Sequence, residues 1–472
     1  MEQFDLLSDR ASSFINQEEI SRVLTYARSH ATDKGLITSI FTKAREMNGL
    51  SAEETAVLLF NNDTETTMQI FALARAIKDT YYGNRIVLFA PLYLSNYCIN
   101  HCIYCPYHAT NSHIPRKKMT QEEIREEVIA LQDMGHKRLA LEAGEHPVYN
   151  PVSYILESID TIYSIHHKAG SIRRVNVNIA ATTVEDYKLL HQAKIGTYVL
   201  FQETYNQQEY EHLHPKGPKS NYAWHTEAMD RAMQAGIEDV GLGVLFGLHN
   251  YAYELVALLL HAEHLEKKYG AGPHTISVPR LRPADGINVD DFKDALPDDI
   301  FLKIVALLRI AVPYTGLIMS TRESEDIRAK ALHLGISQIS GGSKTSVGGY
   351  AAKDENTADS AQFEVADNRT LDEVVLWLMK LGYIPSFCTA CYGKGRQGVD
   401  FMEICKEKQI HNFCSPNALL TLQEYLQNYA SPHTQVIGSA VFNSELAKLP
   451  MGIQESIRKR LSTAIKGDVK FF

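Results

Sequence analysis

The sequence lacks three features that would place the protein at a membrane, outside the cell or on nucleic acid. The first residues, MEQFDLLSDR, do not combine a basic segment with a following apolar one, so no cleaved secretion signal is predicted. The most apolar long window, FLKIVALLRIAVPYTGLIMS, is interrupted by Lys303, Arg309 and Pro313, which indicates a buried helix and a strand rather than a membrane span. Positive charge is not in excess, because the net charge is -9 and the pI is near 6.1. We therefore expect a soluble, cytoplasmic protein that acts on a small molecule, with no nucleic-acid and no membrane partner.

Cysteine is scarce and unevenly placed. The seven cysteines fall into two groups with none between them: Cys98, Cys102 and Cys105, then Cys388, Cys391, Cys405 and Cys414. An odd number, clustered in this way in a reducing compartment, suits metal ligands better than a disulfide framework.

The order of the predicted elements indicates an α/β fold. Residues 1–84 have helical patterns with an N-cap at Ser51 and form a helical leader. Over residues 85–346, eight β-rich runs alternate with amphipathic helical windows, which is the pattern and the length of a (β/α)8 TIM-type barrel; a doubly wound open sheet is the alternative. Residues 347–370 are polar and read as a linker or a surface excursion, and residues 371–472 form a mostly helical C-terminal domain with the second cysteine group.

The first cysteine group should lie in the functional site, because it follows the first strand and sites of these folds lie where strands end. The C-x3-C-x2-C triplet can hold three corners of a cubane iron-sulfur cluster. The fourth iron is then free to chelate an amino and a carboxylate group, which is how a reduced cluster delivers an electron to S-adenosylmethionine (SAM). The alternative is a zinc site with His101 or His108 as fourth ligand.

With this triplet behind the first barrel strand, the sequence resembles the radical SAM superfamily. The resemblance implies that Tyr104 packs on the adenine and that the AGE segment after the second strand binds the SAM amino group. Further residues that it assigns to SAM lie at the ends of later strands and in one following helix: Ala143, Gly144, Glu145, Asn178, Glu203, His225 and Arg231.

The segments FQETYNQQEYEHLHPKGPKSNY, VGLGVLFGL and SVPRLRPADG resemble the tyrosine lyases of this superfamily. Lyases that mature the FeFe-hydrogenase carry an additional C-terminal domain with a C-x2-C-x22-C motif, whereas the 2-iminoacetate synthases of thiazole biosynthesis do not. Cys388, Cys391 and Cys414 have that spacing. The alternatives are a structural zinc site that includes Cys405 or His411, a thiazole-type lyase with a degenerate tail, and an iron-sulfur carrier without radical chemistry.

The resemblance implies two iron-sulfur clusters, SAM and L-tyrosine. A 5'-deoxyadenosyl radical abstracts hydrogen from the tyrosine amino group, and the Cα–Cβ bond breaks to give p-cresol and dehydroglycine. Dehydroglycine then becomes carbon monoxide and cyanide at an auxiliary 4Fe-4S cluster, with or without an extra iron, for which His264 is the predicted ligand and His261 the alternative. The implied partners are ferredoxin or flavodoxin as reductant and other hydrogenase maturation proteins, in an anaerobic setting.

Residues that close the seventh and eighth predicted strands are the candidates for binding the substrate. Arg322 can hold an amino-acid carboxylate through two hydrogen bonds, and we expect it to act beside the three first-group cysteines in catalysis. Hydroxyl and backbone N–H groups of its neighbours can bind the same carboxylate: Ser320, Thr321, Ser340 and Gly341. Arg280 and Arg282, after the sixth strand, are further candidates.

Overall fold

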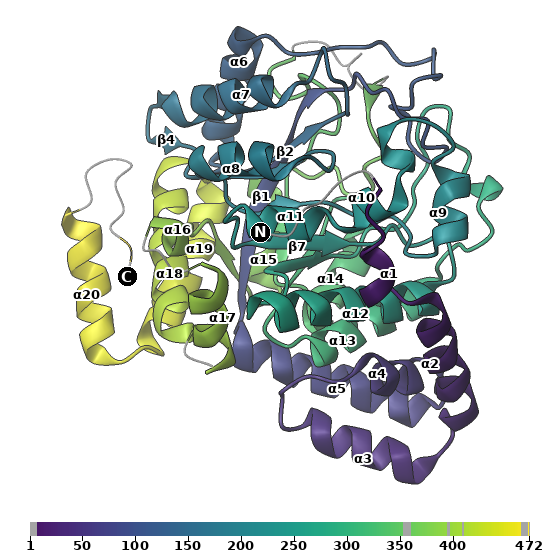
Figure 1. The fold of residues 1–472 in the computed structure, drawn as a ribbon. Helices are drawn as coiled ribbons and strands as arrows, with labels where there is room; N and C mark the ends of the chain where they lie inside the picture. Colours follow the sequence, from purple (N-terminus) through teal and green to yellow (C-terminus); the bar gives the residue numbers. More distant parts are fainter. Residues whose placement is uncertain (1–6, 353–359, 394–396, 408–409, 464–470, 472) are drawn as a thin grey trace.

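The computed structural model describes residues 7–352, 360–393, 397–407, 410–463 and 471. Its centre is a closed barrel of eight parallel strands (Figure 1). In chain order these strands are β1 (Arg85–Ser95), β2 (Arg138–Ala143), β5 (Arg174–Asn178), β6 (Tyr198–Val199), β7 (Val240–Gly243), β8 (Thr275–Ser277), β9 (Gly316–Met319) and β10 (Gln338–Ser340). The barrel closes where Val87 of β1 pairs with Gln338 of β10, which confirms the predicted barrel and excludes an open sheet.

Strand β1 is long enough to pair at both ends of the barrel. Its residues from Ala90 onward pair with β2, whereas Arg85 pairs with Ile384 of a ninth strand, β11 (Ile384–Ser386). This short strand lies outside the barrel and brings the C-terminal region against the end where the strands begin.

Helices cover the outside of the barrel, as parallel strands require. They are α6 (Gln121–Met134), α7 (Val152–Ser164), α8 (Val184–Gln192), α9 (Gln207–Leu213), α10 (Tyr222–Thr226), α11 (Ala228–Gln234), α12 (Tyr251–Tyr269), α13 (Asp298–Ala311) and α14 (Glu325–Leu334). Local sequence sets their ends: Thr120 and Glu123 form a capping box at the start of α6, and Gly135 ends it with a φ of 100°. Smaller elements are the hairpin of β3 (His166–His167) and β4 (Gly170–Ser171) and the 3-10 turns Pro218–Ser220 and Val289–Asp291.

The leader is helical, as predicted, and packs against α12 and α13 (Figure 1). It consists of α1 (Ala11–Phe14), α2 (Gln17–His30), α3 (Lys34–Ala44), α4 (Ala52–Phe60) and α5 (Thr64–Tyr81). The predicted cap is present, since Ser51 and Glu54 form a capping box. Because α13 lies between the barrel and α5, all of its residues from Phe301 to Ala311 are buried, which explains why its sequence is so apolar.

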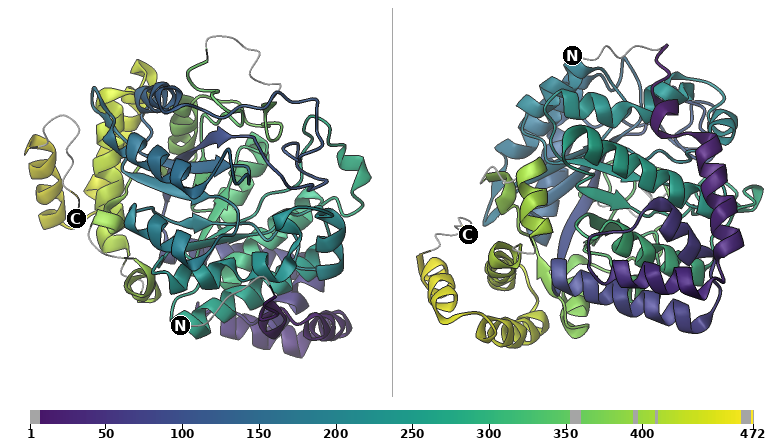
Figure 2. Two further views of the ribbon diagram at one scale, coloured as in Figure 1. Left: turned by 45° about the horizontal axis from the view of Figure 1, so that its top comes forward. Right: turned by 60° about the horizontal axis from the view of Figure 1, so that its bottom comes forward.

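The C-terminal region is mostly helical, and it is the outermost part of the molecule in Figure 2. Its helices are α15 (Leu371–Lys380), α16 (Ala390–Gly393), α17 (Gly398–Lys406), α18 (His411–Asn428), α19 (Pro432–Ala447) and α20 (Met451–Thr463). Within the described part of the chain, no helix is both long and apolar enough to cross a membrane.

Candidate functional site

A large cavity opens at the end of the barrel where the strands terminate, and the three first-group cysteines line it. Backbone hydrogen bonds hold their loop across the cavity mouth. Ile99 N–H donates to the carbonyl of Glu145 at 2.8 Å, and His101 N–H donates to the carbonyl of Lys216 at 3.0 Å. The loop after β1 is therefore fixed by two other loops at the same barrel end.

The electrostatics of this cavity suit a multi-iron group. Burial raises the pKa of Cys105 to about 12 and raises that of Cys102 further, while the nearby Lys219 ammonium lowers both. Lys219 is itself held by an ion pair with Glu203 at 2.8 Å. Among the described residues, no three His, Cys, Asp or Glu side chains converge as a single metal ion requires. Three cysteines that line one cavity beside the partly buried Lys219 ammonium form a donor set that fits an anionic cluster.

The AGE segment lies directly against the cysteine loop, and all three of its residues line the cavity. A Cβ atom on Gly144 would lie 2.4 Å from the carbonyl oxygen of Tyr97, so only glycine allows this close approach. Glu145 accepts a hydrogen bond from the Asn100 side chain at 2.6 Å, and burial raises its pKa.

Of the other residues assigned to SAM, the structure brings all but one to the cavity. Tyr104, Asn178, Glu203 and His225 line it. Arg231 does not, because its guanidinium donates to the carbonyls of Thr182 and Trp224 at 2.8 and 2.6 Å and stacks on the Trp224 ring. The backbone of Glu203 has a φ of 69°, a conformation that non-glycine residues rarely adopt.

At the ends of β9 and β10, Ser320, Thr321, Arg322 and Ser340 line the same cavity. Gly341 does not, because its N–H donates to the Phe89 carbonyl at 3.1 Å and its Cα faces α15.

Of the two arginines after the sixth barrel strand, Arg282 borders the cavity, whereas Arg280 is engaged by Glu323 and Asp298. Sequence reasoning missed several polar cavity residues, among them Lys219, Glu142 and Gln362. The sequence could have pointed to Glu142, because it stands one residue before the AGE segment in a strand.

A second, smaller cavity lies at the opposite barrel end, where the strands begin. Cys388, Cys391 and Cys414 line it together with His274. Cys405 is buried outside its lining. The side chain of His411 lies outside the described part of the structure.

The structure does not bring His264 to this second cavity. Its Nε2 lies 3.0 Å from the Asp230 carboxylate, and its ring stacks on Phe14. His261 contacts the Tyr205 hydroxyl instead. The C-terminal half of α12 faces α11 and α1, so the chain returns to the rim only at His274, directly before β8.

Three buried arginines surround the second cavity: Arg85, Arg138 and Arg174. Burial raises the pKa of Cys388 to about 11, while Arg138 and Arg85 lower it. Arg138 also donates to the Cys388 carbonyl at 2.8 Å. The three thiols can bind a cluster as thiolates, and the three guanidinium groups then compensate the negative charge of that cluster.

The two cavities lie next to each other inside the barrel. Gln338 of β10 lines both of them. On four other strands, two successive inward residues line different cavities. The earlier residue of each pair lines the second cavity and the later residue lines the first cavity: Val87 and Phe89, Arg138 and Ala140, Arg174 and Asn176, Gly316 and Ile318.

Comparisons with known proteins agree with this geometry. A radical SAM superfamily model matches residues 92–261, and a model of the Biotin and Thiamin Synthesis associated domain matches residues 277–384. A crystal structure of HydG, described as a maturase of the FeFe-hydrogenase, is 52% identical with a TM-score of 0.94 and covers 98% of this chain and 100% of that one. HydG from Carboxydothermus hydrogenoformans is 39% identical with a TM-score of 0.84, over 96% of this chain and 99% of that one.

The 2-iminoacetate synthase of Escherichia coli (strain K12) is 30% identical over 345 residues, which are 73% of this chain and 88% of that protein. The HydG structures thus match nearly the whole chain, whereas the synthase matches less of it. With the cysteine triplet and the AGE segment in one cavity of a closed barrel, the chain belongs to the radical SAM superfamily and is a HydG-like enzyme.

Proposed function

We propose that this chain is a tyrosine lyase that supplies carbon monoxide and cyanide for the FeFe-hydrogenase active site. It cleaves the Cα–Cβ bond of L-tyrosine to p-cresol and dehydroglycine, and dehydroglycine is processed further at the C-terminal cysteines. One observation carries the proposal: a single barrel has a cysteine-lined cavity at each end, and Gln338 lines both cavities.

In the first cavity, Cys98, Cys102 and Cys105 would hold the 4Fe-4S cluster that radical SAM enzymes require. When bound, this cluster and SAM supply a one-electron reductive cleavage that yields a hydrogen-abstracting radical. Lys219 offsets the negative charge of the thiolates. The remaining cavity residues of the predicted set would bind SAM: Tyr104, Ala143, Gly144, Glu145, Asn178, Glu203 and His225.

In the same cavity, Arg322 would bind the tyrosine carboxylate through two N–H groups. The hydroxyls of Ser320 and Ser340 border the same space and can donate to that carboxylate. These groups would fix the amino-acid end of the substrate in the cavity that the cysteines and the SAM residues also line.

In the second cavity, Cys388, Cys391 and Cys414 would hold an auxiliary 4Fe-4S cluster. His274 replaces His264 as the proposed ligand of an extra iron, because His274 borders the cavity and His264 does not. Dehydroglycine would pass between the sites beside Gln338, which borders both cavities.

In this proposal the chain divides into a leader (1–84), a barrel (85–346), a connecting segment (347–370) and an auxiliary-cluster domain (371–472). Ferredoxin or flavodoxin would donate the electron, and other hydrogenase maturation proteins would receive the product. The alternative is a 2-iminoacetate synthase, which the second cysteine-lined cavity disfavours.

The test is an anaerobic turnover of reconstituted protein with dithionite, SAM and L-tyrosine, in which p-cresol, carbon monoxide and cyanide are measured. Wild type should form all three. The double variant Cys388→Ser/Cys391→Ser should keep p-cresol and lose carbon monoxide, while Cys405→Ala, a buried cysteine outside the cavity, should behave as wild type. If p-cresol and glyoxylate alone appear in every protein, the synthase alternative is correct. If SAM is cleaved without p-cresol, tyrosine is not the substrate.

A further inference from the structure

Residues 360–369 form a strap across one side of the first cavity, although the sequence predicted only a linker here. Backbone contacts tie the strap to several barrel loops. Among these contacts, Gln362 N–H donates to the Thr345 carbonyl at 3.0 Å, Glu364 N–H to the Pro283 carbonyl at 3.0 Å and Ala366 N–H to the Thr321 carbonyl at 2.9 Å. The strap therefore reaches the same chain segment, residues 320–322, that carries the proposed substrate ligands.

The inner side of the strap contributes two side chains to the cavity wall, Gln362 and Phe363. Gln362 accepts a hydrogen bond from the Tyr93 hydroxyl at 2.8 Å. Phe363 is only 7% exposed, and its ring centroid lies 3.5 Å from the Arg322 guanidinium carbon. One face of the guanidinium is therefore covered by an aromatic ring.

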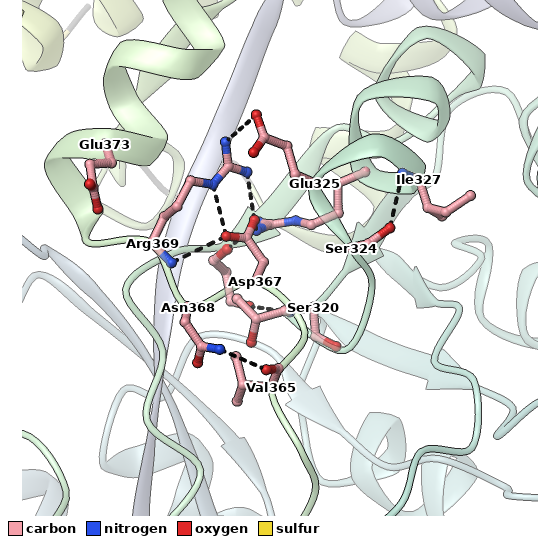
Figure 3. A network of polar contacts seen from close by, with 12 residues as sticks. Ser320, Ser324, Glu325, Ile327, Val365, Asp367, Asn368, Arg369 and Glu373 are labelled. Carbon is pink, nitrogen blue, oxygen red and sulfur yellow. Dashed lines mark hydrogen bonds and ion pairs between the residues drawn. The ribbon is translucent and has the colours of Figure 1, made fainter. Parts of the chain in front are cut away.

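The outer side of the strap is anchored by charge (Figure 3). The Asp367 carboxylate accepts hydrogen bonds from Arg328 of α14 and from Arg369. Arg328 also donates to the Ser340 carbonyl at 2.5 Å, and Arg369 reaches Glu325 at 2.9 Å. Since Asp367 and Arg328 are buried, this cluster fixes the strap relative to the ends of β9 and β10.

We propose that Phe363 is a positioning residue that determines how Arg322 meets the substrate. A ring stacked on one face of a guanidinium leaves the in-plane N–H edge free, and that edge matches the two oxygens of a carboxylate. The strap thereby selects substrates with a free carboxylate, such as an α-amino acid. This inference rests on the proposed function, in which Arg322 binds the tyrosine carboxylate.

Kinetics of three variants test the inference. In Phe363→Leu the guanidinium loses its aromatic cover, so the KM for L-tyrosine should rise about 5- to 30-fold while kcat changes little. Phe363→Tyr keeps the ring and should stay close to wild type. Asn368→Ala is the matched control, because Asn368 lies on the same strap, its side chain donates a hydrogen bond to the Val365 carbonyl, and it does not line the cavity. If Phe363→Leu does not fold, Phe363→Met of similar volume takes its place.

An unchanged KM in Phe363→Leu, or an equal rise in Asn368→Ala, would overturn the inference. A second readout separates this inference from the proposed function. Crystal structures of the cluster-free leucine and tyrosine variants should show the Arg322 guanidinium displaced in the first and retained in the second. If wild type forms no p-cresol, the proposed function fails, and these structures alone decide the role of Phe363. An Arg322 guanidinium that stays in place in both variants would then overturn the inference about Phe363.

Discussion

The Asp367 carboxylate should be among the costliest single groups to remove from this protein. It accepts hydrogen bonds from Arg328, which is fully buried, and from Arg369. Burial would raise the pKa of Asp367, but the two arginines outweigh it and hold that pKa below its usual value. In Asp367→Ala, the Arg328 guanidinium stays buried with no carboxylate partner. Breaking such a buried pair on one side costs about 3–5 kcal/mol of unfolding free energy.

Two further variants check that this cost comes from an unpaired buried charge. The double variant Arg328→Met/Asp367→Leu removes both charges and fills the space with apolar atoms, so it should recover most of the loss. Asp326→Ala breaks an exposed ion pair of the same helix α14, in which Asp326 and Lys330 are one turn apart. This variant should lose only about 0.3–0.5 kcal/mol of unfolding free energy.

Equilibrium urea unfolding of cluster-free, reduced protein measures these differences. The chain has two tryptophans, and Trp377 lies 4.2 Å beneath the Arg369 guanidinium, so its fluorescence reports on the anchor directly. A Trp224→Phe background isolates that signal. If Asp367→Ala costs no more than Asp326→Ala, the reasoning about the anchor is wrong.

Three other predictions concern the cavities. Gln338→Phe should keep p-cresol formation but reduce carbon monoxide and cyanide per p-cresol toward zero, because Gln338 borders both cavities; an unchanged ratio would exclude a route past it. His274→Ala should lower the iron content of reconstituted protein by about one per chain whereas His264→Ala should not, as metal analysis and electron paramagnetic resonance can check. Burial raises the pKa of Glu142 to about 8, so the folded state binds more protons than the unfolded state between about pH 4.5 and 8 and loses stability as the pH rises through that range. Glu142→Gln should remove a slope of up to about 1.4 kcal/mol per pH unit from the unfolding free energy, and melting curves that keep the same pH dependence would contradict this.

The sequence predicts parallel β/α units because eight β-rich runs alternate with helical windows, and the pairing of β1 with β10 decides for a closed barrel over the open sheet. It does not predict β11, since the three residues IPS are too short for a periodicity and include Pro385. That strand exists because Arg85 and its neighbours extend β1 beyond the barrel and offer a free edge. Tertiary pairing, rather than local preference, makes it a strand.

Prediction of the site from the sequence has the same limit. Cysteine spacing and strand ends locate most of the first cavity, because both are properties of local sequence. Periodicity places His264 near the end of α12, but it cannot tell that this turn faces Asp230 rather than the second cavity. Likewise Arg231 lies in the segment where a basic residue was expected, yet its guanidinium is held by backbone carbonyls outside the cavity. Which neighbour a helix face meets is decided by packing between elements that are distant in sequence.

The two-residue period of a β-strand explains how one barrel can hold two sites. Inward side chains recur at every second residue and are about 7 Å apart along a strand. Arg174 therefore faces the second cavity while Asn176, the next inward residue on β5, faces the first. The two sites share their strands, so a change in strand register would move both linings together. This geometry fixes the separation of the two cavities without any linker.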